Sequence, residues 1–223
     1  MEKKNSPKPI RCKAAVCRVP GDPLLIEEVV VAPPNPFEVR IKIICTSLCH
    51  SDITFWRRQD FAQFLPRILG HEAFGVVESL GEGVKEMAVG DAVVPTFLSN
   101  CGDCKGCRSE KSNFCSTVPF TVMPGMPRDG TNRFTDAAGR PLNNFFGVSS
   151  FCEYTVVDVA QVTKVDAALS PEKACLLSCG VATGVGAVWK VAAVEAGSSV
   201  VIFGLGAVGL AVAEGARLHG AAG

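Results

Sequence analysis

Four cysteines lie close together in one polar segment, and their spacing restricts how that segment can fold. Cys101, Cys104, Cys107 and Cys115 follow the pattern C-x2-C-x2-C-x7-C. The two-residue gaps let neighbouring thiolates turn toward one centre, and the longer gap lets the chain loop back with the fourth. Because four thiolates at tetrahedral positions make a closed structural zinc site, the pattern predicts a loop that is folded around a zinc ion.

Two alternatives for this loop have less support. An iron–sulfur segment of the bacterial ferredoxin type places its fourth cysteine after three residues and follows it with proline. Here the gap is seven residues and Ser116 follows the fourth cysteine. Unligated buried thiols would need a core to fill, and a polar loop rich in glycine offers none.

The composition favours an intracellular protein with reduced thiols. The 223 residues include eleven cysteines, an odd number, and the N-terminal segment MEKKNSPKPIRCK has no apolar stretch after its charges. We therefore expect a cytoplasmic location rather than a secreted disulfide framework. The 22 basic and 22 acidic residues leave no net charge, which argues against nucleic acid or an acidic membrane as a partner. The uncharged run at 196–213 contains four glycines, so no membrane segment is expected there.

Short alternating runs predict that the first part of the chain is rich in β-structure. The runs are bounded by Pro, Gly or Asn, as antiparallel strands are, and lie at 11–19, 24–32, 39–45, 72–80 and 91–97. A polar loop region is predicted over 100–144, followed by strand structure over 151–165. Near Ser170 the pattern changes: Ser170-Pro171 is a typical helix start. Helices are predicted over 182–196 and 207–218, with an apolar strand at 199–203 between them.

A glycine motif joins this last strand to its helix. Gly204, Gly206 and Gly209 form the pattern G-x-G-x-x-G. The first glycine makes a tight turn, the second lets the backbone approach a pyrophosphate, and the third permits close helix–strand packing. The predicted fold is a β-rich domain over residues 1–180 followed by the beginning of an α/β Rossmann domain, incomplete, over residues 181–223.

The dinucleotide motif is normally completed by an acidic residue about 20 positions further on, which binds the adenosine ribose. No such residue follows before Gly223, and neither do further parallel strands. A single strand would also expose an apolar edge. We therefore expect the sequence to be a C-terminally truncated fragment or a shortened isoform.

Three separated motifs carry further chemistry: SLCHSD at 47–52, GHE at 70–72 and SCGVATG at 178–184. Two cysteines and one histidine form the ligand set known for the catalytic zinc of alcohol dehydrogenase, which keeps a fourth position open. With CGDCKGC at 101–107 and GLGAVGL at 204–210, the motifs stand in the order and at the spacing of one family. The sequence resembles, over nearly its whole length, the plant zinc-dependent alcohol dehydrogenases of the medium-chain dehydrogenase family.

The resemblance implies a GroES-like catalytic domain with two zinc ions per chain. The catalytic zinc would be held by Cys49, His71 and Cys179, and the structural zinc by the four-cysteine loop. Asp52 and Glu72 would assist at the metal site as partners of the ligands. An imidazole ligand needs its second ring nitrogen held, and a carboxylate is suited to that task.

The resemblance also implies roles around the metal. Ser51 would accept the substrate proton, His50 would face the cofactor pyrophosphate, and Thr183 would face the nicotinamide. Many family members have a histidine where this sequence has Thr54, so proton release is expected to be slower or more dependent on pH. The alcohol's carbon chain would be walled by three aromatic residues, Phe97, Phe145 and Phe146.

Other cysteine and histidine residues have plainer interpretations. Cys45 and Cys175 are expected to be small buried hydrophobic residues. His50 adjoins Cys49, but neighbours on an extended strand point to opposite faces, so a thiolate–imidazole pair is not expected.

The expected function is hydride transfer between a primary alcohol or aldehyde and NAD, with zinc assistance. The alternative is a truncated zinc-binding isoform or fragment without catalytic activity. Short-chain alcohols and the glutathione adduct of formaldehyde both stay open as substrates, as does NADP in place of NAD. Full-length members of the family are expected to be homodimers.

Overall fold

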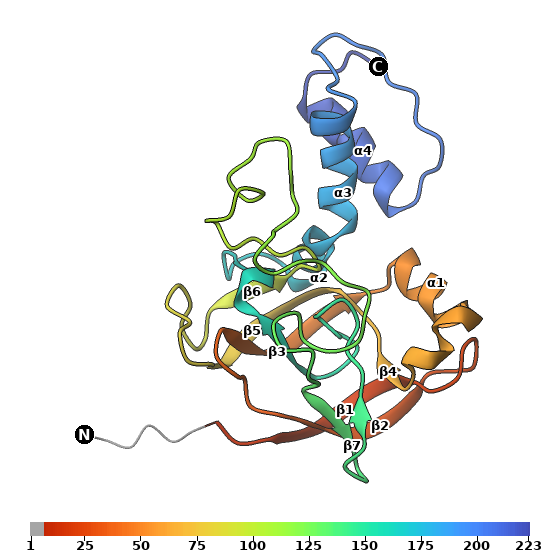
Figure 1. Ribbon diagram of the computed structural model, residues 1–223. Coiled ribbons are helices and arrows are strands. Elements are labelled where there is room, and N and C mark those ends of the chain that lie inside the picture. The colour runs from red at the N-terminus through yellow and green to blue at the C-terminus, as the bar shows by residue number, and fades with distance from the viewer. Residues whose placement is uncertain (1–6) are drawn as a thin grey trace.

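The computed structural model describes residues 7–223, and two antiparallel sheets of five strands form its main body (Figure 1). The first sheet has the order β4-β1-β2-β7-β8, and the second has the order β10-β6-β5-β3-β9. The strands are β1 (Ile10–Cys17), β2 (Leu25–Val31), β3 (Glu38–Ser47), β4 (Arg67–Ile68), β5 (Glu72–Leu80), β6 (Ala92–Pro95), β7 (Phe134–Asp136), β8 (Pro141–Leu142), β9 (Tyr154–Asp158) and β10 (Val162–Lys164).

The first sheet follows the alternation of its sequence. On β1, Cys12, Ala14 and Val16 are buried, whereas Arg11 and Lys13 on the opposite face are exposed. Successive side chains of a strand point to opposite faces, so this alternation buries one face of the sheet and leaves the other in water. The buried face forms an apolar core with residues of β2, β7 and β9.

The second sheet depends on the pairing of β3 with β5. The two strands run antiparallel from Val39 opposite Leu80 to Ser47 opposite Glu72. Val39 and Ile41 on β3 are fully buried and pack with Val77 on β5. Because of this pairing, the segment that follows β3 and the segment that precedes β5 lie at the same end of the sheet.

Most of the predicted strands are confirmed. Strand β5 has the predicted bounds, and β1, β2, β3 and β6 differ from the predictions by a few residues at their ends. The predicted strand region at 151–165 is divided by the short 3-10 helix η2 (Val159–Gln161) into β9 and β10. The polar region at 100–144 is largely loop, as predicted, but includes β7 and β8.

The helices differ more from the predictions. A helix that was not predicted, α1 (His50–Arg57), follows β3, so the assumption that Cys49 and His50 lie on an extended strand was wrong. Ser170 precedes a helix as predicted, although its hydroxyl donates to Glu172 rather than capping the backbone. The remaining helical segments are η1 (Gln59–Phe64), α2 (Pro171–Ala174), η3 (Cys175–Ser178), α3 (Gly180–Gly186), η4 (Ala187–Val191) and α4 (Ala207–Leu218).

The helix predicted over 182–196 begins two residues earlier and ends earlier, with α3 and η4 spanning 180–191. The predicted helix at 207–218 is confirmed as α4. In Figure 1, α3 and α4 stand side by side above the sheets. Their contact is close because Gly184 faces Ala211, where an added Cβ would lie 2.5 Å from the alanine Cβ.

The strand predicted at 199–203 does not form, and this prediction was wrong. A strand needs a neighbour that satisfies its backbone groups along its length. Within residues 7–223, this segment is bonded mainly to the last residues, where Val200 N–H donates to Gly223 at 2.6 Å. Val201 and Phe203 are therefore largely exposed, at 79% and 96%.

Among the described residues, no single helix is long and apolar enough to cross a membrane. The consecutive helical segments Pro171–Ser178 and Gly180–Val191, bent by 56° at their junction, reach that length and composition only together.

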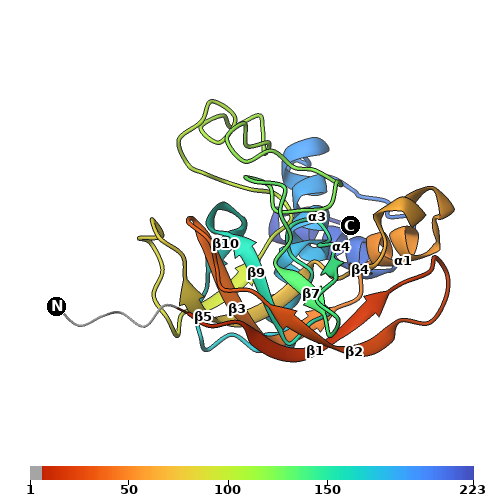
Figure 2. The ribbon, with the colours of Figure 1, turned by 60° about the horizontal axis from the view of Figure 1, so that its bottom comes forward.

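Figure 2 shows β5, β3 and β9 side by side. At Gly75, β5 closely approaches β3. An added Cβ at Gly75 would lie 2.5 Å from the carbonyl oxygen of Lys42 and 2.5 Å from Ile41. We predict that Gly75→Ala lowers the free energy of unfolding by about 1–3 kcal/mol, because overpacking pushes the strands apart. Urea unfolding measures this change.

The matched control is Gly186→Ala in α3, where an added Cβ meets nothing within 4 Å. This control should be neutral or stabilising by up to about 1 kcal/mol. Equal unfolding midpoints for the two variants would contradict the proposed role of the β3–β5 contact.

Candidate functional site

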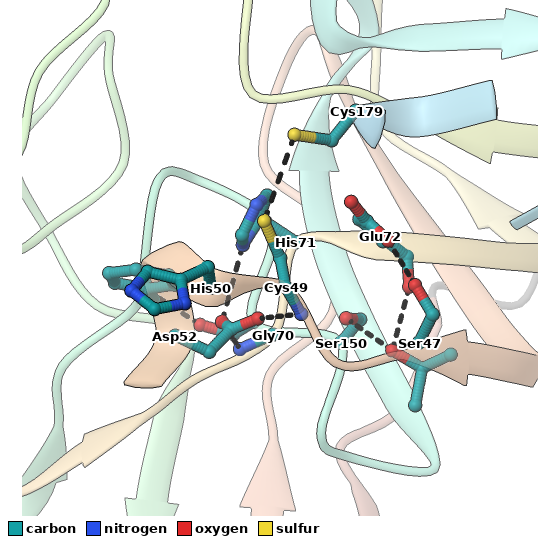
Figure 3. Close-up of polar contacts among 12 residues, drawn as sticks. Ser47, Cys49, His50, Asp52, Gly70, His71, Glu72, Ser150 and Cys179 are labelled. Carbon is teal, nitrogen blue, oxygen red and sulfur yellow. Dashed lines mark hydrogen bonds and ion pairs between the residues drawn. The ribbon is translucent and has the colours of Figure 1, made fainter. Parts of the chain in front are cut away.

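Four residues from three separate segments meet between the sheets and α3 (Figure 3). Their potential ligand atoms, on Cys49, His71, Glu72 and Cys179, all lie within 4.8 Å of one another. Cys49 is the residue before α1, His71 and Glu72 stand where β5 begins, and Cys179 is the residue before α3. The β3–β5 pairing brings the first two segments together, and the packing of η3 on β5 adds the third.

The spacing of the two sulfurs fits a zinc ion. Cys49 Sγ and Cys179 Sγ are 4.0 Å apart. Two thiolates bound at about 2.3 Å in a tetrahedral arrangement are separated by about 3.8 Å. The structure thus places two thiol ligands at the spacing that a tetrahedral metal requires, with an imidazole beside them.

The Asp52 side chain fixes the positions of Cys49 and His71. This side chain is buried, and Oδ2 accepts a hydrogen bond from the backbone N–H of Cys49 at 3.0 Å. Oδ1 accepts from the N–H of Gly70 at 2.9 Å and lies 3.2 Å from Nδ1 of His71. One carboxylate therefore fixes the backbone at one thiol and the orientation of the imidazole, which leaves Nε2 of His71 free for a metal.

The charges of the site also suit a cation. A hydrogen bond from Cys179 lowers the pKa of Cys49 to about 3, with His71 adding to this effect and burial opposing it. The same contact raises the pKa of Cys179, because a second thiolate would face the first. Burial lowers the pKa of His71, but its contacts with Asp52 and Cys49 raise it to about 9. A bound cation would favour the thiolates and displace the imidazole proton.

Glu72 connects all three segments. Ser47 Oγ donates a hydrogen bond to Glu72 Oε2, and the N–H of Gly180 donates to Oε1 at 3.2 Å. Ser47 is two residues before Cys49, and Gly180 directly follows Cys179. Ser47 did not appear among the predicted site residues, because only the strand register reveals that it lies opposite Glu72.

Aromatic rings cover one side of the imidazole. The ring of His71 lies 5.8 Å from that of Phe97, 5.6 Å from Phe145 and 5.4 Å from Phe146, measured between centroids. Phe145 is fully buried and Phe146 nearly so. These three rings are the ones that the family resemblance implied, and the structure places them beside the candidate metal ligands.

The four-cysteine loop forms a second cluster with the same spacing. Cys101 Sγ lies 3.9 Å from Cys107 Sγ, and Cys104 Sγ lies 4.0 Å from Cys115 Sγ. Backbone N–H groups point at the sulfurs, for example from Cys104 to Cys101 at 3.4 Å. These N–H groups favour the thiolate form, so the loop has the geometry and polarity of a closed metal site.

The predicted cofactor residues lie near, but outside, the cluster. His50 is exposed in the first turn of α1, and Thr183 is exposed on α3. Gly204 has a φ of +97°, and an added Cβ at Gly209 would lie 1.9 Å from the carbonyl oxygen of Gly204. The glycine turn is therefore as tight as the motif predicts, although Gly204 and Gly206 are exposed.

The glycine turn and the metal cluster are neighbours. An added Cβ at Gly180 would lie 3.6 Å from Glu72 Oε1 and 3.7 Å from the Cβ of Ala207, the first residue of α4. Ser51 is half-buried in the first turn of α1, next to the cluster in sequence. The start of α4, which directly follows the glycine turn, therefore lies beside the metal cluster.

We predict that Asp52→Asn weakens zinc binding by roughly 10–100-fold, as is usual when a partner of a metal ligand is lost. Both oxygens of Asp52 accept hydrogen bonds, so an amide nitrogen in place of either one faces a donor. Competition with a chelating dye measures the affinity. The control is Asp60→Asn, on an exposed side chain, and equal zinc affinity in the two variants would contradict the proposed role of Asp52.

Comparisons with known proteins identify the family of the chain. The family profile "Alcohol dehydrogenase GroES-like domain" matches residues 35–167. The chain is 65% identical over 221 residues to "Alcohol dehydrogenase-like 7" of Arabidopsis thaliana, covering 99% of this chain and 57% of that protein. It is 54% identical over 213 residues to "Alcohol dehydrogenase 2" of Solanum tuberosum, covering 95% of this chain and 56% of that protein.

Solved structures show the same likeness. The crystal structure of an "Alcohol dehydrogenase zinc-binding domain protein" from Burkholderia ambifaria superposes with a TM-score of 0.86 at 38% identity, covering 96% of this chain and 58% of that one. The benzyl alcohol dehydrogenase of Acinetobacter calcoaceticus superposes with a TM-score of 0.79 at 31% identity, covering 96% and 57%. The chain thus spans a little over half the length of the relatives that it matches. The predicted β-rich GroES-like fold is confirmed, and the chain belongs to the alcohol dehydrogenase family that this GroES-like domain defines.

Proposed function

We propose that this chain provides the metal-binding part of a zinc-dependent alcohol dehydrogenase, which transfers hydride between a primary alcohol or aldehyde and NAD. One observation carries the proposal: two thiols 4.0 Å apart and an oriented imidazole converge beneath an aromatic wall. This is a ligand set with room for a further ligand, unlike the four-thiol loop.

In this proposal, Cys49, His71 and Cys179 hold the catalytic zinc. The bound zinc supplies Lewis acidity, which lowers the pKa of an alcohol hydroxyl toward neutrality. Asp52 keeps the imidazole oriented, and Glu72 keeps the three ligand-bearing segments at their spacing. The substrate's carbon chain lies against the buried ring of Phe146 and its neighbours, which favours small apolar groups.

The cofactor side is formed by the glycine turn and α4. Gly204 and Gly206 leave the backbone open to a pyrophosphate, and the N-terminus of the twelve-residue α4 offers unpaired N–H groups to it. His50 is exposed at the start of α1 and adds a donor for phosphate oxygens. Thr183 faces the nicotinamide from α3. The proposal assigns residues 1–180 to the GroES-like domain and residues 181–223 to the beginning of a Rossmann domain.

Proton release is proposed to pass from the substrate oxygen to the hydroxyl of Ser51. The next group in line is Thr54, whose hydroxyl is bonded at 3.0 Å to the carbonyl oxygen of His50. A hydroxyl tied to its own helix backbone is a poor carrier of protons, and threonine has no buffering capacity near neutral pH.

We predict that Thr54→His raises the turnover rate several-fold at neutral pH and flattens the pH–rate profile, because an imidazole titrates near pH 6.5. Steady-state rates over a range of pH measure this, with Thr54→Ala as the control for loss of the hydroxyl. An unchanged profile in Thr54→His would exclude this position from the proton path.

The function is tested by counting zinc and measuring turnover in the same preparation. We predict two zinc ions per chain by native mass spectrometry, falling to one in Cys179→Ser and to one in Cys104→Ser. Added NAD and a primary alcohol should give reduced nicotinamide in the wild-type protein, and none in Cys179→Ser. Cys17→Ser, which alters a buried thiol outside both clusters, is the matched control and should keep both zinc ions.

The alternative is a zinc-binding form without catalysis. Two bound zinc ions without any turnover would favour this alternative, and zinc only in the four-cysteine loop would contradict the proposed catalytic site. The same mass spectra report whether the protein is the homodimer expected for the family. Activity with NADP would revise the proposed cofactor, and activity with the glutathione adduct of formaldehyde would revise the proposed substrate. A cytoplasmic location, which the reduced thiols favour, remains part of the proposal.

A further inference from the structure

Five cysteines belong to neither metal cluster, and four of them are arranged in pairs. Cys12 Sγ lies 3.6 Å from Cys152 Sγ, and Cys45 Sγ lies 3.8 Å from Cys175 Sγ. Each pair joins parts of the sequence that are 130 or more residues apart. Cys17 is the fifth, and its sulfur contacts the carbonyl oxygen of Val19 instead of another sulfur.

We propose that Cys12 and Cys152 are an oxidative modification site, at which hydrogen peroxide converts the two thiols into a disulfide. The sulfurs are in van der Waals contact and need to approach to about 2.05 Å for the bond. The backbone keeps them adjacent: Ala14 forms a β-bridge with Cys152, and the N–H of Ala15 donates to Phe151 at 2.8 Å. Glu153 N–H donates to Lys13 on the other side at 3.0 Å.

The electrostatics favour a reactive thiolate in this pair. The hydrogen bond from Cys152 lowers the pKa of Cys12, and the charge of Arg40 adds to the effect, while burial and Glu153 oppose it. The same contact raises the pKa of Cys152. Cys12 is therefore the attacking sulfur and Cys152 the resolving one.

The second pair lacks the backbone bridge of the first. Cys45 lies on β3 and Cys175 on η3, which no β-bridge of the described residues joins, and the two sulfurs are 3.8 Å apart. Burial, with the contact to Cys45, also raises the pKa of Cys175 to about 12. The Cys45–Cys175 pair therefore serves as an internal comparison for a pair whose backbone does not hold the sulfurs together.

A path for a small oxidant is present. Cys152 lines a surface groove with a volume of about 410 Å³, together with Ala14, Ala15 and Phe151, and Cys45 of the second pair lines the same groove. Hydrogen peroxide is little larger than water and can enter such a groove. Cys12 is 7% exposed and Cys152 5%, so larger oxidants are disfavoured.

The reaction balances in two steps. The Cys12 thiolate attacks one peroxide oxygen, the O–O bond breaks, and a sulfenic acid forms while the departing hydroxide takes up a proton to become water. The sulfur of Cys152 then attacks the sulfenic sulfur, the S–O bond breaks, and a second water leaves with the thiol proton. Two thiols are oxidised to one disulfide, and one peroxide is reduced to two waters.

The bond would act on the candidate metal site through the backbone. The N–H groups of Ser150 and Phe151 donate to Gly70 and Leu69, both at 3.0 Å, and these residues directly precede His71. A disulfide at Cys152 would thus fasten β1 to the segment that supports the imidazole. Closing a loop of this length restricts the unfolded chain and stabilises the fold.

The test uses the zinc-loaded 223-residue chain, in which both metal clusters protect their thiols. After treatment with hydrogen peroxide, a non-reducing digest analysed by mass spectrometry should show the peptide of Cys12 linked to that of Cys152. We predict that the melting temperature rises by roughly 5 °C or more, and that dithiothreitol reverses both changes. The Cys45–Cys175 link should form more slowly.

Variants separate this site from general oxidation. Cys12→Ser and Cys152→Ser should each abolish the link and the rise in melting temperature, whereas Cys17→Ser, on the same strand as Cys12, should keep both. Oxidation of Cys12 or Cys152 to sulfinic acid without a link would overturn the proposal, as would earlier formation of the Cys45–Cys175 link. The wild-type digest alone decides between these outcomes if a serine variant does not fold.

Discussion

The antiparallel pairing of β3 with β5 is the contact on which the rest of the site depends. It sets Ser47 opposite Glu72, so the chain leaves β3 toward Cys49 beside the point where it enters β5 after His71. A shift of the register by one residue would turn every side chain of one strand to the other face. The buried valines and isoleucines on both strands make such a shift costly. The core therefore fixes the distance between a thiol and an imidazole that are 22 positions apart in the sequence.

Two buried carboxylates then hold the segments that the sheet has brought together. Asp52 accepts backbone hydrogen bonds from the residues Cys49 and Gly70 and contacts His71, and Glu72 accepts from Ser47 and Gly180. A buried carboxylate without partners is strongly unfavourable, so each one requires its donors to stay in place. The segments that supply the candidate metal ligands also supply the hydrogen-bond donors of Asp52 and Glu72. The positions of the ligands and of the two carboxylates therefore depend on one another.

The sequence predicts much of this protein, and the failures have physical causes. Strand β5 was predicted with its observed bounds because its alternating residues lie between Gly70 and Gly81. Helix α1 was missed because Cys49, which stands at its N-cap, is not a residue that usually caps helices. The prediction of a strand at 199–203 was wrong because apolar residues form a strand only beside another strand. Within residues 7–223, no strand lies next to this segment. The sequence identified site residues where they lie in a known motif. The contact of Ser47 with Glu72 follows from the strand register, and no local sequence pattern indicates it.

The central claim is that the chain holds two different zinc sites, one with four sulfur ligands and one with two sulfurs and an imidazole. X-ray absorption spectroscopy at the zinc edge, on the purified chain with its zinc content measured, tests this most directly. The account predicts two zinc ions per chain and an average of three sulfur ligands per zinc at about 2.3 Å, with a shorter nitrogen or oxygen contribution at about 2.0 Å. One zinc per chain with a shell of four sulfurs alone would contradict it, because it would leave Cys49, His71 and Cys179 without a metal.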